Sequence, residues 1–247
     1  MNLQDKVAIV TGASGGIGSA VVRRLAEAGA RVILGYNNKA AEAEKIAASL
    51  PGSGHKAMKI QVLDSASLKE LAATVERDFG RCDVLVNSAG FTKMVPHHDL
   101  DGLTDDLIDS IFAANVRGPF AMVRAFAPLM KKSGDAAIVN ISSVAAISGS
   151  GSNIAYGGSK AAMDTMSISL ARVLGPEIRV MTVSPAAVDT PFVPGRTTAM
   201  VEKVAASTPL KRVVTADEVA QAVMSTITHL TSSTGWIIPV DGGKLVG

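Results

Sequence analysis

Short apolar runs alternate along the chain with longer stretches in which apolar residues recur every three or four positions. The short runs are typical of buried parallel strands, and the longer stretches are typical of helices that bury one face. Pro51-Gly52 and Gly175-Pro176 mark the ends of two such helices. The predicted strands cover residues 7–10, 31–36, 57–63, 82–87, 136–141, 178–183 and 236–240, and the predicted helices cover residues 20–28, 39–50, 65–79, 103–132, 153–174, 199–206 and 216–230.

The alternation of strand and helix predicts an α/β protein, because parallel strands need crossover connections. Crossovers of one hand place helices on both faces of a doubly wound parallel sheet, here of about seven strands. The chain shows no internal repeat, low-complexity tract or linker, so residues 1–247 are expected to form a single domain. Ligands bind such sheets at the carboxyl ends of the strands, and we expect the functional residues there.

The first predicted strand runs into a glycine-rich turn that opens a helix. Residues 11–18 read Thr-Gly-Ala-Ser-Gly-Gly-Ile-Gly, so Gly12, Gly16 and Gly18 stand in the pattern T-G-x-x-x-G-x-G. Glycine lets the backbone turn tightly and approach a pyrophosphate, and the helix N-terminus offers free N–H groups. The spacing differs from the usual Rossmann pattern G-x-G-x-x-G. With a strand before it and a helix after it, we nevertheless favour a nucleotide site over a plain structural turn and expect a Rossmann fold.

Tyr156 and Lys160 are four residues apart on a predicted helix and share one face of it. A lysine ammonium favours the phenolate and lowers the pKa of a neighbouring tyrosine, as the positive charge of an oxidised nicotinamide does. The pair can then donate a proton to a carbonyl or accept one from an alcohol. This spacing alone is more often a solvated helix face, but here the pair follows the strand that ends at Ser142 and Ser143.

With these motifs the chain resembles the short-chain dehydrogenase/reductase family over residues 6–243. The family carries Y-x-x-x-K, a serine thirteen residues before the tyrosine, and an asparagine on the preceding long helix. The matching positions are Asn115, Ser143, Tyr156 and Lys160, with Ser142 as the adjacent alternative to Ser143. The resemblance implies that the tyrosine transfers the proton and the lysine holds the ribose hydroxyls. It also implies that the serine binds the substrate oxygen and that the asparagine keeps a water linking the lysine to solvent.

Other segments are similar to the cofactor-binding landmarks of that family. Residues 87–90, Asn-Ser-Ala-Gly, resemble its N-N-A-G segment beside the adenosine, and Asp64 matches the residue at the adenine amino group. Residues 185–190 resemble its P-G-x-x-x-T segment, in which Val188 and Thr190 meet the nicotinamide amide. The resemblance thus implies cofactor contacts from Gly12, Ser14, Gly16, Ile17, Gly18, Asp64, Ser65, Asn87, Ala89, Gly90, Tyr156, Lys160, Pro185, Val188 and Thr190.

The chain departs from the family pattern at three places, none of which removes a catalytic group. Ser88 replaces the second asparagine of N-N-A-G, and Ala186 replaces the glycine after Pro185. Gly157 and Gly158 stand between the tyrosine and the lysine, and each costs about 1 kcal/mol relative to alanine inside a helix. We expect that packing holds this helix start, or that the small residues admit a close neighbour.

The end of the second predicted strand favours NADP(H) over NAD(H). A carboxylate about 20 residues past the glycines would bind the ribose 2′-hydroxyl and repel a 2′-phosphate. The chain instead has Tyr36, Asn37, Asn38 and Lys39 there, and the nearest acid is Glu42. The two asparagines and the lysine can accept a phosphate. Against NADP(H), the glycine loop has Ser-Gly at 14–15, where many NADP-using relatives carry a basic residue.

The substrate is expected to be a modest-sized, rather apolar ketone or alcohol, because residues 91–98, 144–153 and 188–205 are mostly small or apolar. His97 and His98 are expected to be solvated. The chain resembles the 3-oxoacyl-carrier-protein reductase branch, although no basic patch for an acidic carrier protein is evident. An NAD-dependent alcohol or sugar dehydrogenase stays open, as does a non-catalytic cofactor-binding regulator. The family's habit also implies a homotetramer.

Composition narrows the remaining choices. The net charge is +2 with scattered lysines and arginines, so a nucleic-acid partner is not expected. The single cysteine, Cys82, cannot form an internal disulfide, and no cysteine–histidine cluster suggests a metal site. No stretch approaches the roughly 18 apolar residues of a membrane span, and the start lacks signal-peptide features. We expect a cytoplasmic protein with no membrane partner.

Overall fold

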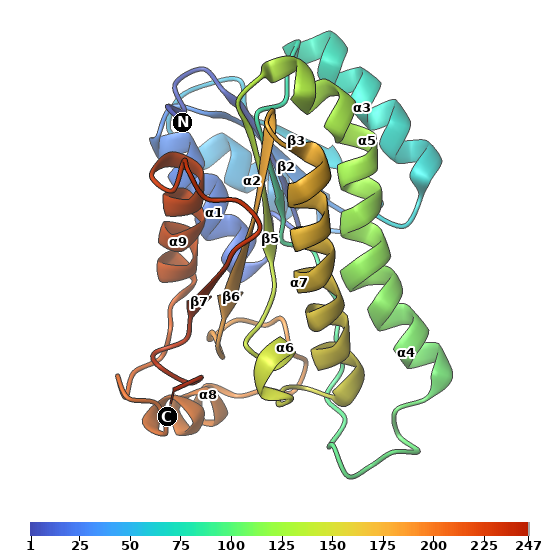
Figure 1. The fold of residues 1–247 in the computed structure, drawn as a ribbon, viewed down its shortest axis with the longest axis vertical. Coiled ribbons are helices and arrows are strands. Elements are labelled where there is room, and N and C mark those ends of the chain that lie inside the picture. Colours follow the sequence, from blue (N-terminus) through green and yellow to red (C-terminus); the bar gives the residue numbers. More distant parts are fainter. Residues whose placement is uncertain (247) are drawn as a thin grey trace.

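The computed structural model describes residues 1–246 and contains one parallel sheet of seven strands (Figure 1). The strands are β1 (Val7–Thr11), β2 (Arg31–Tyr36), β3 (Lys56–Lys59), β4 (Val84–Asn87), β5 (Ala136–Ile141), β6 (Ile178–Pro185) and β7 (Ile237–Val240). They are hydrogen-bonded in the order β3-β2-β1-β4-β5-β6-β7. The order reverses between β1 and β4, which makes the sheet doubly wound and confirms the predicted fold class.

Helices cover both faces of the sheet (Figure 1). They are α1 (Gly16–Glu27), α2 (Ala40–Ser49), α3 (Ser65–Phe79), α4 (Asp105–Phe112), α5 (Gly118–Ser133), α6 (Ala145–Ser148), α7 (Ile154–Leu174), α8 (Thr198–Ala206) and α9 (Ala216–Thr228), with a π-helical turn, η1 (Ala113–Arg117). One face packs against α1, α2 and α9, and the other packs against α3, α5 and α7. The shorter helices α6 and α8 lie at the lower end of the view.

Residues 7–10 of strand β1 are apolar without interruption because they lie between two layers of helices. Ala8 and Val10 belong to the core that α1 and α9 share, whereas Val7 and Ile9 belong to the core of α3, α5 and α7. All four side chains are fully buried. Successive residues of a strand face opposite sides, so a strand between two layers of helices must be apolar at every position. The run seen in the sequence is therefore a consequence of the central place of β1.

Strand β3 is shorter than the sequence predicts, because it ends at Lys59 rather than at residue 63. Its partner β2 ends at Tyr36, which pairs with Lys59, so the residues beyond Ile60 have no strand beside them. The chain turns instead, and Asp64 N donates to the carbonyl of Gln61 at 2.9 Å. The alternation over 57–63 thus belongs to a half-buried segment at the edge of the sheet, of which only residues 56–59 pair with β2.

The predicted helical region 103–132 consists of α4, η1 and α5 in succession. The π-helical turn η1 places Asn115 in the interior of the protein, with none of its side chain exposed. Such turns insert an extra residue into an α-helix and frequently occur at functional sites. Helix α6 was not predicted, because four residues are too few to show a helical period.

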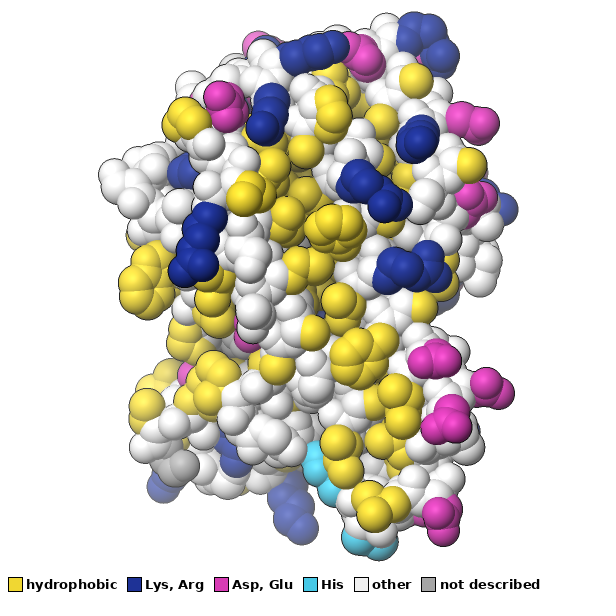
Figure 2. All heavy atoms as spheres, turned by 45° about the vertical axis from the view of Figure 1, so that its right-hand side comes forward, with side chains coloured by type: hydrophobic (Ala, Val, Ile, Leu, Met, Phe, Trp, Pro, Cys, Tyr) yellow, Lys and Arg dark blue, Asp and Glu magenta, His cyan; other side chains and the backbone are white. Residues whose placement is uncertain are grey.

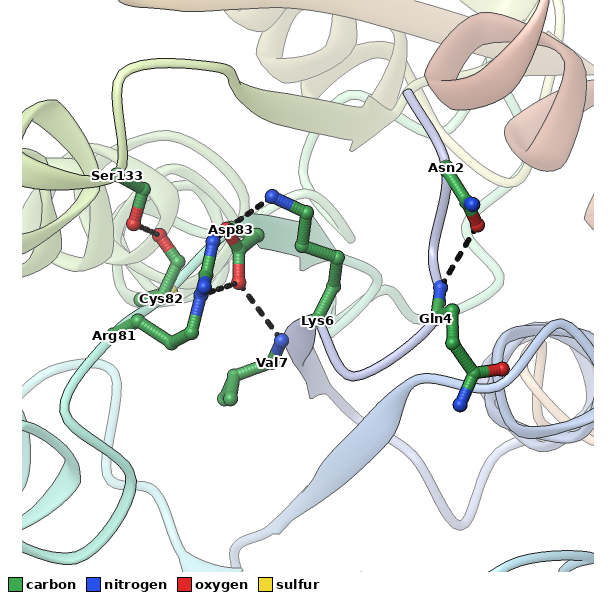
Figure 3. Close-up of polar contacts among 8 residues, drawn as sticks. All are labelled: Asn2, Gln4, Lys6, Val7, Arg81, Cys82, Asp83 and Ser133. Carbon is green, nitrogen blue, oxygen red and sulfur yellow. Dashed lines mark hydrogen bonds and ion pairs between the residues drawn. The ribbon is translucent and has the colours of Figure 1, made fainter.

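At the amino ends of the strands, a buried carboxylate ties β1 to β4 (Figure 3). Asp83 is fully buried and accepts hydrogen bonds from Val7 N at 2.9 Å and from Arg81 Nε at 2.8 Å, with Lys6 Nζ 3.4 Å away. Burial opposes ionisation, but Arg81 and Val7 hold the pKa of Asp83 below its usual range. Neighbouring Cys82 is buried and unpaired, and burial raises the pKa of its thiol, as expected of an inert cysteine.

Candidate functional site

The expected site residues lie at the carboxyl ends of the central strands, the edge opposite Asp83. The glycine turn follows β1, and Ser142 and Ser143 follow β5. Segments 87–90 and 185–190 begin at the last residues of β4 and β6. Adjacent strands β1, β4, β5 and β6 bring these four segments side by side. The sheet therefore assembles one site from parts that are up to 180 residues apart in sequence.

The turn after β1 has the shape that a bound diphosphate needs. Gly12 has φ +64°, and a Cβ added there would lie 2.9 Å from the Cα of Ala89, so only glycine fits. Gly15 is the N-cap of α1 and makes no side-chain capping bond, so no side chain covers the first N–H groups of the helix. These N–H groups and the helix dipole form an anion site, and the residues present fit a dinucleotide cofactor.

Segment 87–90 is held against the glycine turn by Thr11, a role that the sequence analysis missed. The hydroxyl oxygen of Thr11 accepts hydrogen bonds from the backbone N–H groups of Ser88 at 3.1 Å and Ala89 at 3.0 Å. The side chain of Asn87 is buried and donates to Asn140 Oδ1 at 2.8 Å. The Nδ2 of Asn87 is thus engaged within the protein, whereas its Oδ1 is buried without a hydrogen-bond partner among the described residues.

Tyr156 and Lys160 are both buried, with 9% and 4% of their surfaces exposed. Lys160 Nζ donates to the carbonyl of Ile141 at 2.8 Å and lies 5.8 Å from the centre of the Tyr156 ring. Burial raises the pKa of Tyr156 to about 12, while Ser143 and Arg196 oppose that rise. Burial also lowers the pKa of Lys160 to about 8, against the charge of Asp164. The lowering of the tyrosine pKa that was expected from the lysine is therefore not found, because burial of the phenol dominates.

The start of α7 is fixed by its N-cap, Asn153. Its Oδ1 accepts from Tyr156 N at 2.7 Å, and its Nδ2 donates to the carbonyl of Lys93 at 2.7 Å. A Cβ added at Gly157 would lie 3.2 Å from the carbonyl oxygen of Ala145 in α6, whereas Gly158 has ordinary room. The first glycine thus admits the main chain of α6, and the capping asparagine compensates for the weak helix formers.

Asn115 anchors the chain after β4 to the start of α7. Its Oδ1 accepts from Phe91 N at 2.8 Å, and its Nδ2 donates to the carbonyl of Phe91 at 3.0 Å and to Ser159 Oγ at 3.1 Å. Both Nδ2 hydrogens are used in these bonds. A water linking Lys160 to solvent would therefore be held by the main chain of Asn115 or by the remaining lone pair of Oδ1.

The two serines after β5 have different surroundings. Ser142 is buried, and its hydroxyl donates to the carbonyl of Lys160 at 3.4 Å and interacts with Asp164. Ser143 is partly exposed, accepts from Ala145 N at 3.2 Å, and acts on the Tyr156 phenol. This placement gives Ser143 the access to a substrate oxygen that Ser142 lacks.

The residues expected at the adenosine end are mostly exposed. Asp64 caps α3 by accepting from Ala66 N at 3.0 Å and Ser67 N at 3.1 Å, both at Oδ1. The hydroxyl of Ser65 accepts a hydrogen bond from Arg124 Nη2 at 2.9 Å. Both side chains are therefore hydrogen-bonded within the protein, Asp64 to the first turn of α3 and Ser65 to Arg124.

The segment expected at the ribose 2′ position lies at the surface. Asn37, Asn38 and Lys39 are all exposed. Lys39 Nζ pairs with Glu42 at 3.3 Å, and 61% of the lysine side chain is accessible. Such an exposed pair contributes little energy, so the ammonium can turn to a ligand at small cost. No carboxylate precedes it in the segment.

Residues 188–196 fold back over the site after β6. The side chain of Thr190 lies against Gly16 of the glycine turn. The ring of Phe192 lies 6.0 Å from that of Tyr156, and Arg196 Nη2 donates to the carbonyl of Val188. Arg196 was missed by the sequence analysis. The signal that could have found it is a lone cation in the apolar run Pro-Phe-Val-Pro-Gly-Arg at 191–196.

Two features are absent from residues 1–246. No three or more histidine, cysteine, aspartate or glutamate side chains in that range gather to hold a metal ion. Among the same described residues, no helix is long and apolar enough to cross a membrane.

Comparison with known proteins gives matches along the whole chain. A family model described as enoyl-(acyl carrier protein) reductase matches residues 12–244. A 3-oxoacyl-[acyl-carrier-protein] reductase of Thermotoga maritima is 34% identical over 250 residues, covering 100% of both chains. A D-threitol dehydrogenase of Mycolicibacterium smegmatis is 40% identical over 75% of this chain and 71% of its own. The crystal structure of a 3-ketoacyl-(acyl-carrier-protein) reductase from Brucella melitensis complexed with NADH superposes with a TM-score of 0.89, at 28% identity, over 99% of this chain and 100% of that one.

Proposed function

This chain belongs to the short-chain dehydrogenase/reductase family and is an oxidoreductase, and on that premise we propose that it transfers a hydride between NADP(H) and a carbonyl compound or secondary alcohol. Tyr156 is the proposed proton donor in reduction and acceptor in oxidation. The single observation that carries the proposal is the buried arrangement of Tyr156 with Lys160 and Ser143 at the carboxyl edge of the sheet.

Each residue of this arrangement has a separable task. Burial raises the pKa of Tyr156 to about 12, so the phenol is protonated at neutral pH and can donate to an oxygen that gains negative charge. Its role as acceptor in oxidation requires that positive charges beside it, those of Lys160 and an oxidised nicotinamide, lower this pKa. Ser143 hydrogen-bonds the same oxygen and stabilises its developing charge. Lys160, anchored on Ile141, supplies a positive charge beside the phenol and donors for ribose hydroxyls. A bound nicotinamide supplies or accepts the hydride.

Asn115 and Asn153 keep this arrangement in place. Asn115 ties Phe91 to Ser159, which lies next to Lys160. Asn153 fixes the first turn of α7 and so the position of Tyr156. Displacements of about 1 Å at such a site cost large factors in rate, so the rigidity of both contacts supports catalysis.

The preference for NADP(H) rests on the exposed segment Tyr36–Lys39, which offers two amides and one ammonium to a 2′-phosphate. NAD(H) is the second candidate, favoured by the lack of a basic residue in the glycine loop and by the NADH bound in the related Brucella protein. An NAD-dependent alcohol or sugar dehydrogenase is the corresponding alternative, and the D-threitol dehydrogenase relative supports it.

The proposed substrate is a small ketone or alcohol, and the cytoplasmic location stays an expectation from the sequence. A homotetramer is the proposed assembly. Figure 2 brings forward the right-hand side of Figure 1, to which α4, α5 and α7 contribute. Hydrophobic side chains run down this face. Phe112, Phe120 and Ile168 are exposed apolar side chains of these helices. A second copy of the chain would cover such side chains.

The test is fluorescence titration of the purified protein with NADPH and NADH in parallel, followed by initial rates with a ketone panel. We expect NADPH to bind at least tenfold more tightly than NADH. Tighter binding of NADH would support the NAD-dependent alternative and direct the assay to alcohols with NAD. Binding of neither cofactor would contradict the proposed reaction itself.

A further inference from the structure

Arg196 is a cation without a carboxylate partner in the part of the chain that the structure describes. Its backbone N–H donates to the carbonyl of Val193 at 3.2 Å, and its Nη2 donates to the carbonyl of Val188. Its Nε is buried and has no hydrogen-bond partner among residues 1–246. Partial burial lowers the pKa of this guanidinium. Removing a charged donor from water without a counter-charge is costly in free energy. The guanidinium of Arg196 lacks the counter-charge that would offset this cost.

Other arginines are satisfied by groups of the protein itself: Arg24, Arg77, Arg81 and Arg212 by carboxylates, and Arg179 by main-chain carbonyls. Arg24 pairs with Asp217 at 2.6 Å, and Arg81 pairs with Asp83 at 2.6 Å. The carboxylate of Asp189 acts on Arg196 through its charge but forms no ion pair with it, and its Oδ2 accepts from Thr198 Oγ1 at 3.1 Å. The free Nε–H of Arg196 therefore points to an anion that the protein itself does not provide.

The position of Arg196 identifies where that anion comes from. Phe192 of the same segment lies against the ring of Tyr156, and the charge of Arg196 reaches the Tyr156 phenol. The segment 192–196 thus brings its one cation into the surroundings of the Tyr156 side chain. A molecule that meets both residues carries its reacting carbonyl or hydroxyl a short distance from a negative group.

We propose that Arg196 binds a carboxylate of the substrate, so that the enzyme acts on small oxo acids or hydroxy acids. This inference rests on the proposed function and deepens it. A guanidinium offers a planar pair of donors that matches a carboxylate, and a partly buried pair is stronger than one in water. The sequence analysis expected a rather apolar substrate from the mostly apolar residues of 188–205 and gave no weight to Arg196. The proposal changes that expectation to a small substrate that carries a carboxylate.

The cofactor diphosphate is the other possible source of an anion, and the experiment separates the two. Initial rates with NADPH are measured for acetoacetate and its methyl ester, and for 4-oxopentanoate and its methyl ester. The preferred acid is expected to have at least a tenfold higher kcat/KM than its ester. Arg196→Met is expected to remove that preference, with the Kd for NADPH unchanged, and Arg196→Lys is expected to keep part of it.

Arg23→Met is the matched control, because Arg23 is an exposed arginine of α1 far along the helix from the glycine turn. It should leave the ratio of acid to ester unchanged. Equal rates for acids and esters in the wild-type protein would overturn the inference without any variant. So would an Arg196→Met protein that loses NADPH affinity while keeping the wild-type ratio, because the anion would then be the cofactor's own.

A failure of the proposed function gives a different result. If neither cofactor binds, calorimetry with 4-oxopentanoate and its methyl ester on the cofactor-free protein decides the matter. If the wild-type protein binds the acid and Arg196→Met does not, the carboxylate site is supported. If the wild-type protein does not bind the acid, the inference is wrong. Circular dichroism of each variant shows whether a loss reflects the site or the fold.

Discussion

The two ends of the proposed cofactor site are built in opposite ways. At the nicotinamide end, Tyr156, Lys160 and Asn115 are buried, and the latter two are fixed by hydrogen bonds to main-chain atoms. At the ribose 2′ end, Asn37 and Lys39 are exposed, and the lysine has only a surface pair with Glu42. From this comparison we expect that the reaction depends on the packed interior, whereas the choice of cofactor depends on a few solvated side chains.

The difference follows from the cost of burying polar groups. A buried amide or ammonium destabilises the fold unless it is hydrogen-bonded, so its partners must be provided by the same packing that buries it. An exposed side chain has no such requirement and can be exchanged with little effect on stability. Substitutions at the buried end should therefore change rate or stability, and substitutions at the exposed end should change specificity alone.

The largest expected effect is that of Tyr156→Phe. The substitution removes the proton donor and leaves the buried ring, so kcat should fall by roughly 10²–10⁴-fold, the usual contribution of general acid catalysis. The Kd for the preferred cofactor, measured by fluorescence, should stay within about twofold, since the hydroxyl is one contact among many. Survival of a turnover rate near that of the wild type would falsify the proposed role of Tyr156.

The same contrast explains how much the sequence predicts. The strand 7–10, the glycine turn and the helix that carries Tyr156 and Lys160 follow from short-range patterns, because burial and turn geometry act on neighbouring residues. The place of segments 87–90 and 185–190 at one edge of the sheet follows from the rule that ligands bind at the carboxyl ends of parallel strands. The strand order was not predicted and is known from the structure. The structure shows the predicted fold class.

What the sequence does not predict depends on distant partners. The end of β3 at Lys59 is set by the end of β2, and the need for glycine at 157 is set by Ala145 of α6. The two serines after β5 are adjacent in sequence, but Ser142 is buried and Ser143 is partly exposed. The isolation of Arg196 from carboxylates is likewise a property of the folded segment, which no local pattern expresses.

At the exposed end, Asn37→Asp should reverse the proposed cofactor preference. A carboxylate there would repel a 2′-phosphate and accept from a ribose hydroxyl, so the Kd for NADPH should rise about tenfold or more, equivalent to about 1.4 kcal/mol. The Kd for NADH should stay the same or fall, and the melting temperature should not change. Asn2→Asp, which places the same charge at another exposed asparagine, serves as the control. An equal loss for both cofactors would instead indicate damage to the glycine turn.

At the buried end, the smallest expected effect is a shift in pH dependence. Burial lowers the pKa of Lys160 to about 8, and the charge of Asp164, one helical turn further along α7, acts against that fall. The protonated lysine is the form that donates to ribose and faces the phenol, so kcat/KM for the cofactor should decline as the pH rises through about 8. In Asp164→Asn the supporting negative charge is lost, the pKa of Lys160 falls further, and the decline should move to lower pH by roughly half a unit, about 0.7 kcal/mol. A uniform loss of rate with the midpoint of the decline unchanged would mean that Asp164 only packs the helix, and that the charge of Lys160 is set by burial alone.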